Sequence, residues 1–354
     1  YYTPEDVAAA LVAWAVRSEG DRLLDPSCGD GRFIARHANS VGVEQVAESA
    51  RLATARAPAA EVHTADFFAW ADATAERFDC AAGNPPFIRY QTFNGLTRAR
   101  ALALCAQHGA RFSGLSSSWA PFLVAAATLL RPGGRMAFVV PAEIGHAPYA
   151  APLLEYLVAH FAHVQVVAVR EKLFPDLSED CWLLYADGYG GQTDCLLFTA
   201  CDRFTPAATP PPTGTRVSVD EWREVWGRRL RPYILSSGAR AAYQAAASHR
   251  DSRRLGEIAA VGIGYVSGAN DFFHLRPSQA SALGIPGAYL RPSVRNGRAL
   301  PPAGPLTAGV VEGWLADDEP VLLLRLRADD DVPRAVRRYL DSDAGREART
   351  AYKC

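Results

Sequence analysis

The chain has 354 residues, a formal net charge of −1 and 49% hydrophobic residues, which is enough to bury a large core and to form two domains. No apolar run reaches the roughly 18 residues of a membrane-spanning helix, and no basic-then-apolar leader opens the sequence. We therefore expect a cytoplasmic protein without a membrane partner. The seven cysteines form no CxxC pair and no close Cys/His spacing, which argues against a metal site.

The first predicted element is a helix within "YYTPEDVAAALVAWA" (Tyr1–Ala15). Thr3 is expected to cap this helix, Pro4 suits its first turn, and Asp6 completes a T-x-x-D pattern. The free amide groups in the first turn of a helix attract anions. The segment therefore predicts a helix whose first turn can attract an anion.

Short apolar runs alternate with helical patterns over the next 180 or so residues, and this alternation is typical of a doubly wound, mostly parallel α/β sheet. A final pair of strands, joined by the glycine-rich "DGYGGQT", is expected to close the sheet as a hairpin. The predicted strands are Arg22–Asp25, Val41–Glu44, Glu61–Asp66, Phe78–Gly83, Arg135–Pro141, Val164–Val169, Cys181–Ala186 and Asp194–Ala200, and the predicted helices between them include Glu48–Ala57, Trp119–Leu130 and Pro152–Phe161.

A proline-rich segment, "TPAATPPPTGT" (Thr205–Thr215), follows the last predicted strand and indicates a domain boundary. We expect a first domain at residues 1–203, a linker at 204–215 and a second, α+β domain at 216–354. Glycine-studded, strand-like pieces such as "IAAVGIGYVSG" appear in the second domain. The ending "TAYKC" shows no closing element, which leaves open whether this domain is complete.

The first strand ends in "DPSCGDGRF" (Asp25–Phe33). Gly29 and Gly31 allow a tight turn that brings the backbone close to a ligand at the carboxyl edge of the sheet. The third glycine of a dinucleotide-binding pattern is replaced by Ile34. The turn therefore predicts a ligand other than a dinucleotide.

Acidic residues end three successive predicted strands: Asp25, Glu44 and Asp66. Glu44 is placed to accept both hydroxyls of a ribose, and Asp66 to accept an exocyclic amine, with Phe67 available to stack on a purine. A single acidic residue at such a position is more commonly a helix cap. The three together predict a nucleoside ligand with an amino-acid-like tail.

The fourth strand stops at Asn84-Pro85-Pro86-Phe87. Neither proline can donate a hydrogen bond to a neighbouring strand, and both fix their own φ angle. A plain proline-rich loop is one interpretation. The other is a rigid lip at the edge of the ligand site.

The motifs "DPSCGDGRF", "VGVE", "TADFF" and "GNPPF", in this order, resemble the S-adenosylmethionine-dependent DNA amino-methyltransferases of bacterial restriction-modification systems, in particular the gamma class, which makes N6-methyladenine. The segment "LGEIAAVGIGYVSGANDFFHL" (Leu255–Leu275) is similar to the opening of that family's target-recognition domain. The resemblance implies a seven-stranded Rossmann-like methyltransferase sheet, S-adenosylmethionine as cofactor and double-stranded DNA as substrate. The cofactor contacts it implies are Thr3, Asp25, Ser27, Cys28, Gly29, Gly31, Glu44, Asp66, Phe67 and Asn84.

The resemblance also gives the proline loop a chemical role. The Asn84 side-chain oxygen and the Pro85 carbonyl would each accept one N–H of a target amine, while Pro86 stiffens the loop. Phe87 would stack on a base flipped out of the duplex. Phe174 matches the residue that covers the second face of that base, although ordinary core packing explains Phe174 equally well.

Other functions share these motifs. N4-methylation of cytosine uses the same arrangement of acceptors, and similar loops occur in methyltransferases that act on guanine in ribosomal RNA or on glutamine in proteins. A non-catalytic DNA-binding subunit with a methyltransferase fold is a further alternative. We expect a monomer associated with the bacterial nucleoid, and a cognate restriction endonuclease is a candidate partner.

Overall fold

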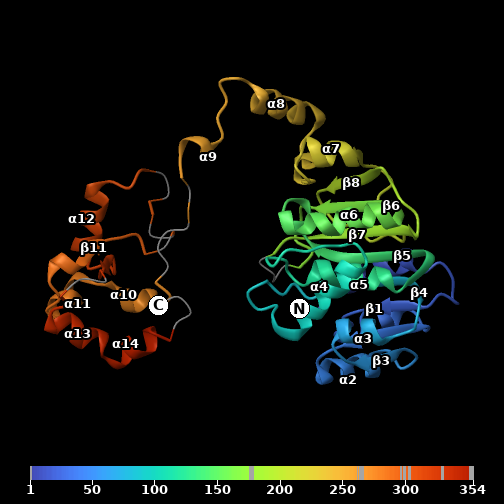
Figure 1. Cartoon of the computed structure of the whole chain (residues 1–354), viewed down its shortest axis with the longest axis horizontal. Coiled ribbons are helices and arrows are strands. Elements are labelled where there is room, and N and C mark those ends of the chain that lie inside the picture. Colours follow the sequence, from blue (N-terminus) through green and yellow to red (C-terminus); the bar gives the residue numbers. More distant parts are fainter. Residues whose placement is uncertain are drawn as a thin grey trace. The chain divides into compact units, whose positions relative to one another are not determined.

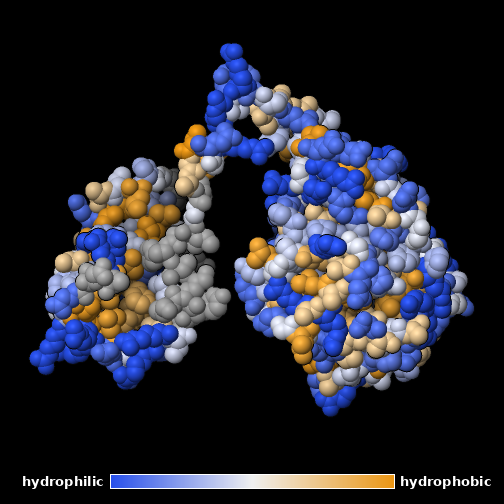
Figure 2. All heavy atoms as spheres, viewed as in Figure 1, coloured by the Kyte–Doolittle hydropathy of each residue, from blue (hydrophilic) through white to orange (hydrophobic). Residues whose placement is uncertain are grey.

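The computed structural model describes residues 2–174, 179–260, 262, 267–295, 297, 300–301, 304–327 and 331–350. The chain divides into two compact units, Tyr1–Ser252 and Arg253–Cys354 (Figure 1). The first unit is a sheet with helices on both faces, and in the view of Figure 2 its surface is mostly hydrophilic, with small apolar areas between the polar ones. No helix in the described part of the chain has both the length and the apolar character of a membrane span.

The first unit is built on a nine-stranded sheet with the order β3-β2-β1-β4-β5-β7-β6-β8-β9. All strands run parallel except β7 and β9, which are antiparallel to their neighbours. The predicted mostly parallel α/β sheet is confirmed, and β8 and β9 extend it beyond seven strands. The strands are β1 (Leu23–Asp25), β2 (Ser40–Glu44), β3 (Glu61–Thr64), β4 (Phe78–Gly83), β5 (Leu130–Pro141), β6 (Phe161–Val169), β7 (Cys181–Tyr189), β8 (Cys195–Cys201) and β9 (Thr215–Ser218).

Helices cover both faces of this sheet because the side chains of its strands alternate between two cores. Ala137 and Val139 of β5 pack with α1, whereas Phe138 and Val140 face the cluster that contains α3, α5 and α6. The predicted helices at α2, α5 and α6 are confirmed. The helices of this unit are α1 (Glu5–Ala15), α2 (Ala47–Arg56), α3 (Phe67–Ala73), α4 (Gly95–Gln107), α5 (Trp119–Thr128), α6 (Ala151–His160), α7 (Val219–Glu224) and α8 (Ser237–Ser248), with short 3-10 turns η1 (Ile34–Arg36), η2 (Ala142–Gly145), η3 (Pro148–Ala150) and η4 (Arg231–Ile234).

The predicted hairpin between the last two strands is wrong. β7 lies between β5 and β6, and β8 lies on the far side of β6, so β7 and β8 are not neighbours. All residues of β7 from Cys181 to Ala186 are buried. A strand that is apolar on both faces suits an inner position of the sheet, where both of its edges are paired.

The predicted domain boundary also differs from the structure. β9 pairs with β8, with Phe198 opposite Thr215, so the proline-rich segment is a connection between two strands of one sheet. Trp222 of α7 is 0% exposed and packs in the same core as Leu230 and Tyr233. The first unit therefore continues to Ser252, because the elements after the prolines complete its core.

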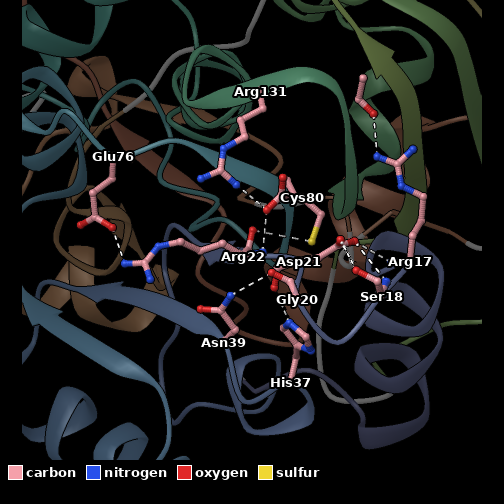
Figure 3. A network of polar contacts seen from close by, with 12 residues as sticks. Arg17, Ser18, Gly20, Asp21, Arg22, His37, Asn39, Glu76, Cys80 and Arg131 are labelled. Atoms are coloured by element: carbon pink, nitrogen blue, oxygen red, sulfur yellow. Dashed lines mark hydrogen bonds and ion pairs between the residues drawn. The ribbon is translucent and has the colours of Figure 1, made fainter.

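A polar network ties together the ends of β1 and β4 at the amino edge of the sheet (Figure 3). The Arg22 backbone N–H donates to Asp79 Oδ2 over 2.8 Å, and the Arg22 guanidinium binds Glu76. Arg131 binds the same Asp79 carboxylate. These contacts lie at the edge opposite the ends of the strands where the candidate site is found, and they fix the two central strands relative to each other.

The second unit combines a small sheet with short helices, as the predicted α+β domain requires. Its strand order is β10-β12-β11, all antiparallel, and its core contains Leu275, Ile285, Leu324 and Val336. Of the predicted strand-like piece "IAAVGIGYVSG", residues 261 and 263–266 lie outside the described residues. The elements are α9 (Leu255–Ile258), α10 (Asn270–Phe273), β10 (His274–Leu275), α11 (Pro277–Ala282), η5 (Gly287–Tyr289), β11 (Leu290–Pro292), α12 (Ala308–Ala316), β12 (Leu322–Leu324), α13 (Arg334–Leu340) and α14 (Asp343–Ala348).

Candidate active site

A cavity of about 580 Å³ lies where β1, β2, β3 and β4 end. Because these four strands are parallel, their carboxyl ends meet at one edge of the sheet, which is where ligands bind in open α/β sheets. The cavity is lined by Pro26, Ser27, Val43, Glu44, Gln45, Val46, Ala65, Asp66, Phe67, Asn84, Pro85, Pro86, Phe87, Ile88, Phe93, Thr97, Phe122 and Glu179.

The structure brings most of the predicted site residues to this cavity, and places the others around it. Those that line the cavity are Ser27, Glu44, Asp66, Phe67, Asn84, Pro85, Pro86 and Phe87. Those that do not line it are Thr3, Asp25, Cys28, Gly29, Gly31 and Phe174.

Asn84 follows β4 and is fixed in the wall of the cavity. Its Nδ2 donates to Thr3 Oγ1 over 3.2 Å, and its backbone carbonyl accepts from Ser27 Oγ over 3.2 Å. Its side-chain oxygen Oδ1 is buried and has no hydrogen-bond partner within the described residues. A buried acceptor without a donor costs free energy, so this atom is suited to accept a hydrogen bond from a ligand.

The Pro85 carbonyl is a second free acceptor beside Asn84. None of the described residues donates to it, whereas the Pro86 carbonyl accepts from Ser118 Oγ. The loop therefore offers two adjacent oxygens, one from the Asn84 side chain and one from the Pro85 backbone.

Thr3 does not cap α1, contrary to the prediction. Pro4 is the N-cap of this helix and no side chain caps it. The Thr3 hydroxyl instead accepts from Asn84, and the Thr3 carbonyl accepts from Arg32 over 2.7 Å. Thr3 is buried, so this bond to Asn84, rather than a cap, satisfies its side chain.

Glu44 is held by two backbone N–H groups. Gly29 donates to its Oε2 over 3.0 Å, and Val46 donates to its Oε1 over 2.7 Å. Gly29 has a φ of +54°, a value that favours glycine. The glycine turn thus orients the carboxylate, and each oxygen keeps a lone pair for a ligand.

Gly31 and Cys28 serve packing. Gly31 has a φ of +86°, and a Cβ there would lie 2.9 Å from Ala53 Cα, so only glycine allows α2 to approach this closely. The Cys28 thiol packs against Gly42 of β2, and burial raises its pKa well above the usual value. A ligand contact by either residue would have to come from the backbone.

Asp25 is 1% exposed and lies beneath the cavity. Its Oδ1 accepts from the Ser27 N–H over 3.1 Å, while its Oδ2 has no partner in the described part of the chain. Burial raises the pKa of this carboxyl to about 8, the Ser27 bond opposes the shift, and the negative charges of Glu44 and Asp30 add to it. The carboxyl is therefore largely protonated near neutral pH.

Asp66 caps a helix and also lines the cavity. Its Oδ1 accepts from the Ala69 N–H over 2.9 Å, which caps α3, and its Oδ2 accepts from Thr97 Oγ1 over 2.9 Å. The same residue lines the cavity. Phe67, next to it, is 3% exposed and stacks on Phe122 with ring centres 5.2 Å apart, so it forms a fixed apolar wall.

The two predicted stacking residues differ in position. Phe87 lines the cavity, is half-buried, and packs against the clusters on both faces of the sheet. Phe174 is 5% exposed and packs in the cluster that α1 covers. Core packing therefore accounts for Phe174 as it stands, and its contact with a base stays a prediction.

Sequence patterns missed several residues around the cavity. Thr97 binds Asp66, Phe122 supports Phe67, and Arg89 forms an ion pair of 2.9 Å with Glu179 at the cavity wall. Ser118, at the start of α5, bonds to the proline loop. The only available signal for Ser118 was a serine directly before a predicted helix, which by itself indicates a cap.

Comparison with protein families decides what kind of protein carries this cavity. A family described as Eco57I restriction-modification methylase matches residues 38–174, and one described as Type II methyltransferase M.Eco57I, C-terminal domain, matches residues 228–354. Both matched families are thus described as restriction-modification methyltransferases, and they match successive parts of the chain. The first match contains most of the residues that line the cavity, including Glu44, Asp66 and Asn84.

Two curated relatives are similar to parts of this chain. Type II methyltransferase M.TthHB8I of Thermus thermophilus is 31% identical over 148 residues, which are 40% of this chain and 34% of the relative. Type II methyltransferase M.CvrRI of Paramecium bursaria Chlorella virus XZ-6E is 32% identical over 98 residues, 26% of this chain and 25% of the relative. The matches thus span about a third or less of each relative.

One solved structure resembles nearly the whole chain. The type IIG restriction endonuclease BpuSI matches with a TM-score of 0.53 and 15% identity, over 96% of this chain and 45% of that chain. At this identity the match concerns the fold alone.

Proposed function

We propose that the protein transfers a methyl group from S-adenosylmethionine to the N6 amine of adenine in double-stranded DNA. The observation that carries this proposal is the pair of free acceptors at the end of β4, the buried Asn84 Oδ1 and the Pro85 carbonyl, in the cavity of a restriction-modification DNA methyltransferase. A primary amine has two N–H groups, and two adjacent acceptors match it.

The cavity fits the cofactor in size and chemistry. Its volume of about 580 Å³ lies within the range of roughly 300–1,000 Å³ that small-molecule sites show. S-adenosylmethionine supplies a methyl group on a positively charged sulfur. Glu44 offers oxygens for ribose hydroxyls, Asp66 an acceptor for the adenine amine, and Phe67 an apolar wall for the ring.

The proline loop supplies the positioning that this reaction needs. The exocyclic amine of adenine is conjugated with its ring, so its lone pair is poorly available. Hydrogen bonds from both of its N–H groups to Asn84 and Pro85 pull the nitrogen toward tetrahedral geometry. Bound S-adenosylmethionine would supply the methyl group to this nitrogen and leave as a neutral thioether, and the amine would then lose one proton to water. Preorganised acceptors lower the barrier without a general base.

The target base has to leave the duplex to reach this cavity, at a cost of a few kcal/mol. Phe87 offsets part of that cost by stacking, which is worth about 1–3 kcal/mol per base. We propose Phe174 for the second face of the base. We propose that the second unit recognises the DNA sequence. We also propose that the protein acts as a monomer in the cytoplasm and that its partner is a cognate restriction endonuclease.

Mass spectrometry of nucleosides tests the reaction. The protein is incubated with methyl-deuterated S-adenosylmethionine and, separately, with duplex DNA, ribosomal RNA and a protein extract. We expect deuterated N6-methyladenine in the DNA. N4-methylcytosine in the DNA, methylguanine in the RNA or methylglutamine in the protein would each replace the proposal.

Asn84→Ala tests the assigned role of the loop. This variant should lose methyl transfer and keep most of its affinity for the cofactor, because the amide acts on the target amine. Asn94→Ala is the matched control, since Asn94 is exposed just before α4 and its side chain caps nothing. Full activity in Asn84→Ala would contradict the proposed mechanism.

A further inference from the structure

The Asn84–Ile88 loop makes few backbone hydrogen bonds. Pro85 and Pro86 have no N–H groups, and the loop lies outside the strands of the sheet. From Pro85 to Ile88, every backbone hydrogen bond found among the described residues involves Ser118. Thr3 and Ser27 hold Asn84, whereas the backbone of the loop after Pro85 is held by a residue 30 positions downstream of Ile88.

Ser118 makes three bonds to the loop. Its hydroxyl donates to the Pro86 carbonyl and accepts the Ile88 N–H over 3.0 Å. Its own N–H donates to the Ile88 carbonyl over 3.0 Å. Both ends of the Pro86–Ile88 segment are thus hydrogen-bonded to the same residue, Ser118.

Ser118 is itself immobilised by the core. It is 0% exposed and directly precedes α5, whose residues Trp119 and Leu123 are also 0% exposed. Water cannot replace the bonds of a hydroxyl in such a place. Because α5 is packed in the core of the first unit, the loop is tied to the most rigid part of that unit.

The two proline carbonyls of the loop differ in their hydrogen bonds. With the Pro86 carbonyl occupied by Ser118, the Pro85 carbonyl remains without a donor within the described residues, beside the free Asn84 Oδ1. We infer that Ser118 is a positioning residue for methyl transfer, which holds the backbone after Pro85 so that the Pro85 carbonyl stays beside the Asn84 side chain that Thr3 holds. This inference rests on the proposed function and adds to it a residue that does not line the cavity.

A neighbouring serine provides a matched control. Ser116 is 1% exposed, lies in the same segment, and its hydroxyl has no partner in the described part of the chain. Ser118→Ala removes the partner of the Pro86 carbonyl and of the Ile88 N–H, whereas Ser116→Ala removes a hydroxyl that has no partner among the described residues. The two variants remove the same atom from similar surroundings, and only one of them releases the loop.

The experiment measures methyl transfer and loop protection in the same proteins. Single-turnover transfer to duplex DNA, at saturating cofactor and DNA, should fall by up to about 100-fold in Ser118→Ala, the loss expected for a displacement of about 1 Å. The dissociation constant for S-adenosylmethionine should stay unchanged. Hydrogen exchange of the Ile88 amide should become faster. Ser116→Ala should match the wild type in all three measurements.

Two results would overturn the inference. One is a Ser118→Ala variant whose rate and Ile88 exchange equal those of Ser116→Ala. The other is a loss of rate with an equal loss of cofactor affinity, which would indicate general damage. If Ser118→Ala fails to fold, Ser118→Cys, which keeps a weaker donor and acceptor, should show a smaller decrease in rate and partial protection.

The exchange measurement separates this inference from the proposed function. If the wild-type protein methylates no DNA, the proposed function fails, and with it the catalytic part of this inference. Protection of the Ile88 amide by Ser118 needs no substrate, so an unprotected amide in the wild type would overturn the positioning role by itself.

Discussion

Asp25 is the residue whose charge state is most altered by the fold. It ends β1, is 1% exposed, and carries an oxygen without a partner among the described residues. Its pKa rises to about 8, mainly because burial disfavours the charged form. In the unfolded chain the same group has its usual pKa of 3.8. Between pH 3.8 and about 8, the folded protein therefore binds a proton that the unfolded chain has already lost.

This difference predicts a decrease in stability as pH rises from 4 to 8. The folded pKa is raised, so the free energy of unfolding should decrease by up to about 1.4 kcal/mol per pH unit on account of Asp25, and level off above pH 8. Asp25→Asn removes the titrating group and should lose this dependence. The measurement is urea unfolding of both proteins from pH 5 to 9. A constant difference in unfolding free energy between them would contradict the assigned pKa.

Not every residue of the site could be predicted from the sequence. Asp66 was expected either to bind a ligand or to cap a helix, and it does cap α3 while lining the cavity. Thr3 matched a capping pattern, but its hydroxyl binds Asn84 instead. The sequence could not show this bond, because the partner is 81 positions away and leaves no local signal. Ser118 was missed for the same reason. Local patterns show which bonds a side chain can make, and tertiary packing decides among them.

The existence of the strands was more predictable than the order in which they pair in the sheet. The six parallel strands from β1 to β6 were all recognised. Most of them, although not the exposed β3, appear as apolar runs because they are covered on both faces. The same property hid the place of β7, since an apolar run suits any inner position. The strand β9 was missed altogether. It is short, Thr215 and Arg216 are polar, and it follows prolines that suggested a break.

The position of β9 and α7 predicts where the first unit can be cut. A chain of residues 1–252 should fold and bind S-adenosylmethionine like the whole protein, because it keeps β9, α7 and Trp222. A chain of residues 1–204 should be much less stable, since removal of one large buried aromatic side chain alone costs roughly 3–5 kcal/mol. Thermal unfolding and calorimetric titration check both. Equal stability of the two chains would show that the elements after the prolines do not belong to this core.

The molecule as a whole separates a unit that carries the cavity from a second unit with a core of its own. All residues that line the cavity precede Ser252, whereas the second unit has its own core of Leu275, Ile285, Leu324 and Val336. The family match at residues 228–354 begins inside the first unit and continues through the second. We propose that this second unit, which lines no part of the cavity, selects the DNA sequence.

The removal of the second unit tests this division of labour. A chain of residues 1–252 should bind the cofactor but lose binding to specific DNA sites. What remains should be contact with phosphates, with dissociation constants of about 10⁻⁴ to 10⁻⁶ M and a slope of log affinity against log salt near −0.9 for each phosphate contacted. The whole chain should bind its sites several orders of magnitude more tightly, because base contacts add to the phosphate contacts. Footprinting at two salt concentrations, on DNA fragments that contain the sites at which the protein methylates DNA, distinguishes specific binding from phosphate contact alone. If the shortened chain protected the same sites as the whole protein, recognition would lie in the first unit, and the second unit would need another role.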